Sequence, residues 1–341
     1  MIEVELYKVF QRKLVAVVFV GILLFTAMSV WNDLSMYINK DKYNELQQEM
    51  ECYEKYKGKL TDERIAEFGK EFKLDGVGYD YISNRFFVNG EQVPVKELYG
   101  DISFDIQFGY FKLWLFLFSS MTTNIKYVPI FISIAFSTLF TYDNQCGMPE
   151  ILLSTKNGRK TCTKAKIIVA VGVSNLLYIL ILLISLIPFF LITHGIGSDT
   201  SIQMTPWLMA SKVDMNYKRL LIHTIIIGFL EINVLVILTL CASIICKNPM
   251  TAMCVCLGIL FVWRPDIMAT HINNIIVNVI TALTPYNIVD TVNLVKQDLV
   301  SVFGIQMSFI KLAELIYSIL LIVGGVVFVK ILSKNQKYFA I

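Results

Sequence analysis

Long uncharged stretches of apolar residues recur along this chain and limit what it can fold into. The first, Leu14–Trp31, runs for 18 residues without a charge. A transmembrane helix needs about 20 mostly apolar residues. Five later stretches have a similar character: Tyr127–Tyr142, Ile167–Ile192, Leu220–Cys246, Met250–Trp263 and Leu312–Val329. We therefore expect an all-α polytopic membrane protein with six transmembrane helices, of which the second and fifth are short.

The composition agrees with a chain dissolved in lipid. Only 17% of the residues are charged and 55% are hydrophobic, whereas a soluble domain carries roughly 25% charged residues. The net charge of +3 is too small to indicate a nucleic-acid partner. The seven cysteines contain no CxxC pair, so the sequence supports neither a zinc site nor a redox motif.

The distribution of lysine and arginine predicts the orientation in the membrane. Leu14–Trp31 is longer than the apolar part of a signal peptide, so we read it as a retained span. If the N-terminus is cytoplasmic, the inner segments carry twice as many basic residues as the shorter outer segments, which is the asymmetry found in cytoplasmic loops. The inner residues are Lys8, Arg12, Lys13, Lys156, Arg159, Lys160, Lys164, Lys166, Lys247, Lys330, Lys334 and Lys337; the outer ones are Lys212, Lys218, Arg219, Arg264, Lys296 and Lys311. Both termini are therefore expected in the cytoplasm.

Residues 32–126, between the first two spans, read as a small α+β extracytoplasmic domain. Apolar residues recur at helical spacing in Tyr43–Tyr53 and again after Thr61, which precedes two acidic residues and is a plausible helix start. Asn89-Gly90 lies between two short β-prone runs and predicts a hairpin with a type I′ turn. The remainder divides into 1–31, an interfacial helix and span one, and 127–341, the membrane domain with spans two to six. Within that domain, 267–295 is apolar but broken by asparagine and proline, so we expect a re-entrant segment.

The inner loop 143–166 is the most informative stretch for function. Gly147 and Pro149 indicate a turn, Glu150 would stand in the positive first turn of a helix, and basic residues follow. One interpretation is an interfacial helix whose lysines contact anionic lipid.

The amino-acid sequence of this loop also resembles that of the ABC-2 family of export permeases, in which the corresponding loop couples to an ATPase subunit. The resemblance lies in Gly147-x-x-Glu150-Ile-Leu-Leu-Ser-Thr, the following Arg159, and Ala165-Lys166 at the entry to a span. It extends to Glu5-Leu-Tyr-Lys8 and to Leu283-Thr-Pro-Tyr-Asn-Ile, and it departs at Asp143-Asn-Gln, where the family often has another acid.

The resemblance implies that Gly147, Glu150, Arg159 and Lys166 contact a nucleotide-binding ATPase subunit. It also implies a homo- or heterodimer of two permease halves. This chain has no G-x-x-x-x-G-K-[ST] motif, so ATP and Mg²⁺ are expected on the partner chain. The chain itself would be a transport subunit without enzymatic activity or a cofactor of its own.

Glu231, inside the fourth apolar stretch, is the other candidate functional residue. A carboxylate at that depth is costly, so it is predicted either to make an interhelical hydrogen bond with Asn233 or another polar neighbour, or to line a translocation path. Glu314, three residues after Lys311, is expected to form an interfacial ion pair. The three histidines share no ligand spacing with carboxylates or thiols, so no metal site is predicted.

Two other function classes stay open. The outer domain could bind a ligand in a membrane-anchored sensor or immunity protein. An ion-coupled secondary carrier using Glu231 has less support, because no internal repeat is visible. The abundance of Ile, Lys and Asn favours a bacterial cell membrane as the location. The cargo is not encoded in any motif that we can read.

Overall fold

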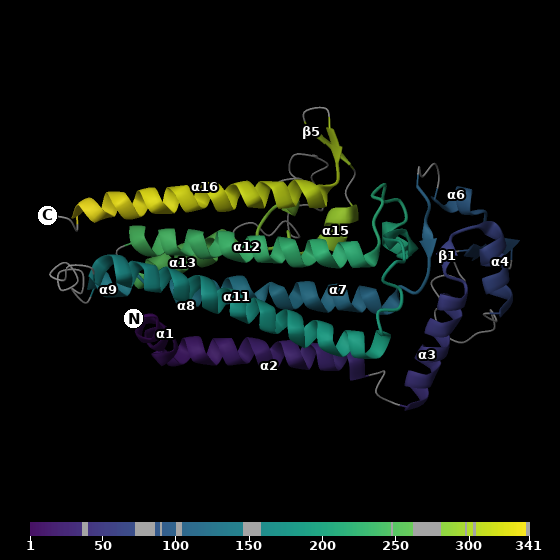
Figure 1. Cartoon of the computed structure of the whole chain (residues 1–341), viewed down its shortest axis with the longest axis horizontal. Coiled ribbons are helices and arrows are strands. Elements are labelled where there is room, and N and C mark those ends of the chain that lie inside the picture. The colour runs from purple at the N-terminus through teal and green to yellow at the C-terminus, as the bar shows by residue number, and fades with distance from the viewer. Residues whose placement is uncertain are drawn as a thin grey trace.

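The long apolar helices lie side by side in one elongated bundle, and a small polar domain covers one end of it (Figure 1). The structure is a computed structural model that describes residues 1–35, 40–71, 86–88, 91–99, 104–145, 158–246, 248–261, 281–296, 299–302 and 305–338. Both termini lie at the end opposite the polar domain. We call the two ends the terminal end and the domain end.

Among the described residues, nine helices build the bundle and its terminal end. They are α1 (Ile2–Gln11), α2 (Lys13–Ser35), α7 (Lys112–Ile125), α8 (Tyr127–Phe136), α9 (Thr141–Gln145), α11 (Gly158–Thr193), α12 (Tyr217–Ile245), α13 (Pro249–Phe261) and α16 (Phe309–Tyr338). α12 packs against α16, α8, α11 and α13 and is the central helix. A helix satisfies its own backbone hydrogen bonds, which is why it can cross lipid.

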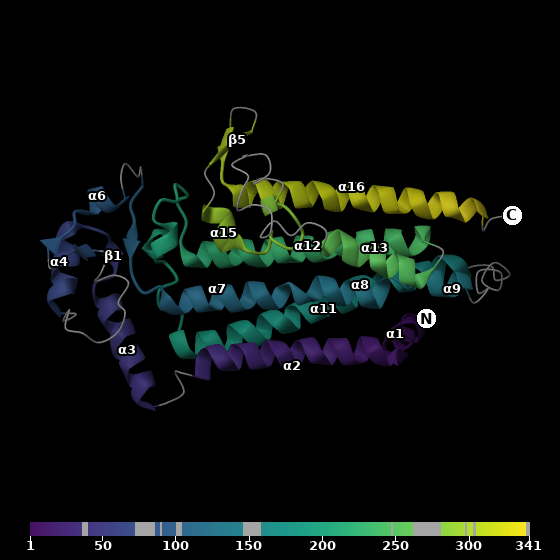
Figure 2. The same cartoon turned by 180° about the vertical axis from the view of Figure 1, so that it is seen from behind.

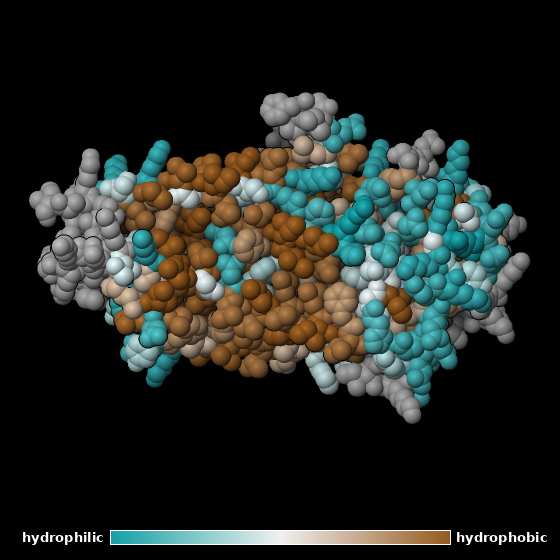
Figure 3. All heavy atoms as spheres, in the orientation of Figure 1, coloured by the Kyte–Doolittle hydropathy of each residue, from teal (hydrophilic) through white to brown (hydrophobic). Residues whose placement is uncertain are grey.

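Among the residues that the structure describes, five helical segments are long and apolar enough to cross a membrane: Lys13–Ser35, Lys112–Asp143, Thr161–Thr193, Tyr217–Ile245 and Phe309–Lys334. The protein is therefore mainly helical and of the multi-pass membrane class. Only 17% of the most apolar window of α2 and 11% of that of α16 are buried in the protein. These two helices lie at opposite edges of the bundle in both views (Figures 1 and 2). Their exposed side chains belong to the apolar surface over the middle of the bundle (Figure 3), where lipid would cover them.

The second membrane segment is longer than the sequence predicts. It begins at Lys112, not Tyr127, and so takes in the last part of the stretch 32–126 that we assigned to the outer domain. α7 and α8 join at Lys126, whose φ of −60° and ψ of −15° are helical. The sequence boundary rested on the charge of Lys126. Neighbouring helices bury 61% of the window, which is how the segment accommodates more polar residues than α2 does.

The fifth predicted span is short in the structure as well. α13 has 13 residues, which is about 20 Å of helix, less than the roughly 30 Å of a bilayer's hydrocarbon core. Most of the predicted re-entrant segment 267–295 lies outside the described residues. The described part, from residue 281 onward, forms turns and the short helix α15 (Thr291–Lys296). β5 (Val300–Val302) and β6 (Ile305–Met307) then pair antiparallel before α16.

The polar domain confirms the local features predicted for it. It contains α3 (Lys40–Lys55), β1 (Gly58–Lys59), α4 (Asp62–Glu71), β2 (Phe87–Val88), β3 (Glu91–Gln92), α6 (Val95–Tyr99) and β4 (Gln107–Phe108). β2 and β3 pair antiparallel, as expected of a hairpin around residues 89–90. Thr61 Oγ1 accepts the backbone N–H of Arg64 at 3.3 Å and caps α4. Tyr53, Phe68 and Phe108 form the aromatic centre of the domain, with ring centroids 5.0–5.6 Å apart.

The domain is held to the bundle by the segment between α11 and α12. Ser201 exchanges two hydrogen bonds with the backbone of Gln107, at 2.8 and 3.0 Å. The indole N–H of Trp114 donates to the carbonyl of Ile196 at 2.8 Å. Gly197, with φ of +81°, brings this segment so close to Tyr110 that a Cβ would lie 2.0 Å from its carbonyl oxygen. Contacts of this kind place the domain firmly on the helix ends.

Candidate functional site

The predicted site residues that the structure describes lie in two separate regions. Gly147 and Glu150 lie outside the described residues, as does the side chain of Arg159, whose backbone belongs to the first turn of α11. Lys166 lies two turns further along α11, at the terminal end of the bundle. Glu231 lies in the middle of α12. Two of the predicted coupling positions, Arg159 and Lys166, thus lie on α11. Glu231 lies on a different helix, α12.

Lys166 is almost completely buried and joins the two ends of the 143–166 loop. Its side chain is 3% exposed and forms an ion pair with Asp143. The ammonium also donates to the carbonyl of Leu139 at 2.7 Å and lies 4.8 Å from the ring centroid of Phe140. These contacts join the start of α11 to the end of the second membrane segment, so Lys166 positions both ends of the loop.

Polar side chains also bind the helix α1 to α11 and to the end of the second membrane segment. Glu5 is buried, with 2% of its surface exposed. Its Oε1 accepts from Lys8 Nζ at 2.7 Å and from the thiol of Cys162 on α11 at 3.7 Å. Arg12 follows α1, donates to Thr138 Oγ1, and lies 5.3 Å from the ring centroid of Tyr142. α1, α9 and the start of α11 thus form one connected platform.

A cavity of about 550 Å³ lies between α1 and the end of the second membrane segment. This volume is in the range of small-molecule and cofactor pockets, about 300–1,000 Å³. Its lining contains two acidic residues, two basic residues and several apolar ones. The lining residues are Glu5, Lys8, Val9, Gln11, Arg12, Leu139, Tyr142 and Asp143.

The two cations of this cavity differ in their electrostatic surroundings. Burial lowers the pKa of Lys8, but the hydrogen bond and the negative charge of Glu5 outweigh that effect and raise it above its usual value. Burial lowers the pKa of Arg12, and the opposing effects of Tyr142 and Asp143 do not offset it. Both side chains stay protonated at neutral pH, because their ordinary pKa values are above 10. Lys8 thus has a carboxylate partner, whereas Arg12 is a partly desolvated guanidinium.

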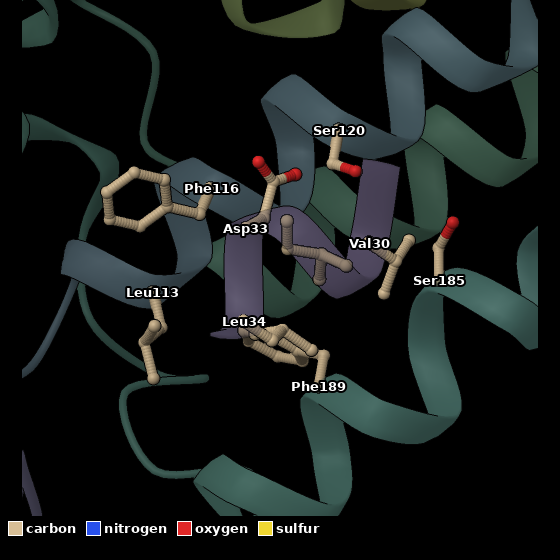
Figure 4. Close-up of a pocket in the computed structure, with 9 residues that line it drawn as sticks. Val30, Asp33, Leu34, Leu113, Phe116, Ser120, Ser185 and Phe189 are labelled. Atoms are coloured by element: carbon tan, nitrogen blue, oxygen red, sulfur yellow. The ribbon is translucent and has the colours of Figure 1, made fainter. Parts of the chain in front are cut away.

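A smaller pocket lies near the domain end among α2, α7 and α11 (Figure 4). Asp33, Ser120 and Ser185 are the polar side chains of its otherwise apolar lining. Its volume is about 20 Å³, close to what one water molecule requires. This pocket is therefore too small to hold a substrate in the conformation described.

Glu231 is the most unusual ionisable residue of the bundle. It is fully buried, and neither carboxylate oxygen has a hydrogen-bond partner among the described residues. Tyr178 on α11, Tyr317 on α16 and Lys126 in the second membrane segment lie within electrostatic reach of it. The hydroxyls of both tyrosines donate elsewhere, to the carbonyls of residues 225 and 283.

Asn233 does not serve as the partner of Glu231 that the sequence suggested. Its amide exchanges two hydrogen bonds with that of Asn175 on α11, at 3.1 and 3.2 Å. Because residues two apart on a helix point in different directions, Asn233 faces α11 without bringing its amide to Glu231.

The expected ion pair of Glu314 also differs from the sequence prediction. Its Oε1 lies 2.6 Å from Nδ1 of His223 on α12, and no ion pair with Lys311 is present among the described residues. The two residues are 91 positions apart, so no local spacing indicated this contact. Arg12 lines the cavity at the terminal end, and sequence reasoning did not select it as a site residue. Its one signal was the run of basic residues at the start of the first span.

No protein-family model, curated protein or solved structure matches this chain. Among the residues that the structure describes, no group of three or more His, Cys, Asp or Glu side chains could hold a metal ion. The site must therefore be interpreted from its own chemistry.

Substitutions at Glu231 separate a hydrogen-bonding role from an ionic one. If the chain is a transport subunit, we expect Glu231→Gln to keep most of the activity and Glu231→Leu to lose it, because the amide preserves a buried polar group of the same size. The measurement is substrate-dependent ATP turnover in nanodiscs, with Asn233→Leu as a matched control on the same helix. Loss in both Glu231 variants would indicate a required anion, and full activity in both would remove Glu231 from the site.

Proposed function

We propose that this chain is the membrane-spanning permease subunit of an ATP-driven exporter similar to the ABC-2 family. The observation that carries the proposal is the platform at the terminal end. There, the Lys166–Asp143 ion pair and the contacts of Glu5 and Arg12 tie α1, α9 and α11 together. A force applied to the 143–166 loop would therefore move α8 and α11 as connected bodies.

The proposal assigns the orientation and the partners. The terminal end faces the cytoplasm, in keeping with its basic residues, and the polar domain faces outside. The short helix α13 supplies the fifth of six spans and α16 the sixth. Gly147, Glu150 and Arg159 contact a separate nucleotide-binding subunit, which supplies ATP and Mg²⁺. Two permease halves enclose the path, with Glu231 as a candidate lining residue.

Co-purification with an ATPase tests the proposal. The tagged chain is co-expressed with Walker-type ATPase subunits from the same genome, and the complex is reconstituted in nanodiscs. We expect one ATPase to co-purify and to hydrolyse ATP faster in the complex than alone. The control is the same ATPase with its Walker lysine substituted, which should bind without turnover. If no Walker-type ATPase associates, the chain is better explained as a sensor or immunity protein.

A further inference from the structure

The helix α1 has two chemically different sides. Ile2 and Leu6, four residues apart on one face of the helix, are 47% and 38% exposed, so their apolar side chains have little protein cover. Glu5 and Lys8 instead line the cavity at the terminal end. A helix with one apolar and one charged side lies in the interface between lipid tails and headgroups.

Arg12 lies where the interfacial helix α1 ends and the first span begins. It is the residue between α1 and α2, with extended φ and ψ of −71° and 102°. The apolar run of the first span begins only two residues later, at Leu14. The guanidinium of Arg12 therefore lies at the level of lipid headgroups, whichever side of the membrane the terminal end faces.

Two basic side chains line the cavity, Lys8 and Arg12. Arg12 is the one without an ion-pair partner among the described residues. Glu5 is paired with Lys8 and Asp143 with Lys166. Arg12 forms no ion pair with any carboxylate of the described residues; it donates to the hydroxyl of Thr138 and lies over the ring of Tyr142. A guanidinium has five N–H donors, so donors and a net positive charge remain for a ligand.

We propose that this cavity binds the phosphate headgroup of an anionic phospholipid. Arginine matches phosphate geometry with paired N–H donors, and Lys8, a second cation, lines the same cavity. The apolar lining residues Val9 and Leu139 suit the glycerol and upper acyl groups. The site does not depend on the proposed transport function.

Binding of a short-chain lipid to the purified full-length chain in detergent tests this site. Dihexanoyl-phosphatidylglycerol is titrated against dihexanoyl-phosphatidylcholine, and thermophoresis reports the affinity. We expect the anionic lipid to bind more tightly. Arg12→Gln should weaken its binding by about tenfold or more, the equivalent of one charged hydrogen bond, while Arg12→Lys should keep most of it. The matched control is Lys13→Gln, an exposed neighbour outside the cavity, which should bind as the wild type does.

Three results would overturn the proposal. Equal affinity for the two lipids in the wild type would exclude an anion-selective site, whatever the variants do. Unchanged binding in Arg12→Gln, or an equal loss in Lys13→Gln, would place the lipid elsewhere. Competition by inorganic phosphate at the same concentration as the anionic lipid would identify a site for free phosphate. A melting curve for each variant separates loss of binding from loss of fold.

Discussion

Lys166→Met is expected to destabilise the folded chain by about 3–5 kcal/mol, which is typical when one partner of a buried ion pair is removed. Methionine keeps the length of the side chain but not its charge. The Asp143 carboxylate, with a side chain only 13% exposed, would then lack its cation. The carbonyl of Leu139 would also lose its donor.

Unfolding by SDS in mixed micelles, followed by circular dichroism, measures this effect. Lys164→Met is the matched control, because Lys164 is exposed two residues earlier on the same helix; we expect a change within about 0.5 kcal/mol. The double variant Lys166→Met with Asp143→Leu should recover much of the stability, because no unpaired charge remains. Equal stability of Lys166→Met and the wild type would show that the pair does not hold the platform together.

Glu150→Lys is expected to abolish coupled transport while the chain still inserts and folds. If Glu150 contacts a basic group or a helix N-terminus of the ATPase, the wild-type contact contributes about 1–3 kcal/mol when partly buried. A lysine there replaces attraction with repulsion, so the loss exceeds that of simple truncation. Glu150 lies outside the described residues, but the loop that carries it begins at Asp143 and ends at Lys166, which the structure joins directly.

Pull-down of the ATPase and ATP hydrolysis in nanodiscs measure this second effect. Glu3→Lys is the matched control, because it makes the same charge change on an exposed residue of α1 at the same end of the bundle. Insertion and folding are checked by protease resistance of the polar domain. An interfacial loop that only contacts anionic lipid would tolerate an added lysine. Normal association and turnover in Glu150→Lys would therefore remove the main support for an exporter.

Patterns that are local in sequence predicted the elements well. The uncharged run before Trp31 became the long helix α2, and the position of Thr61 predicted the start of α4. The antiparallel pairing of β2 with β3 agrees with the hairpin predicted from the Asn-Gly dipeptide. Each of these features depends on residues within a few positions of one another, so propensity and spacing are enough to recognise it.

Contacts between elements required the tertiary structure. The sequence by itself determined that the chain is a set of apolar helices with a small polar domain, because hydropathy and periodicity are properties of each segment alone. Packing decided that Lys126 lies inside a membrane segment and that Lys166 is buried against Asp143. It also decided that Asn233 pairs with Asn175, 58 positions away. The physical reason is that these partners depend on how each helix is rotated against its neighbours, and side-chain packing across the whole bundle sets that rotation.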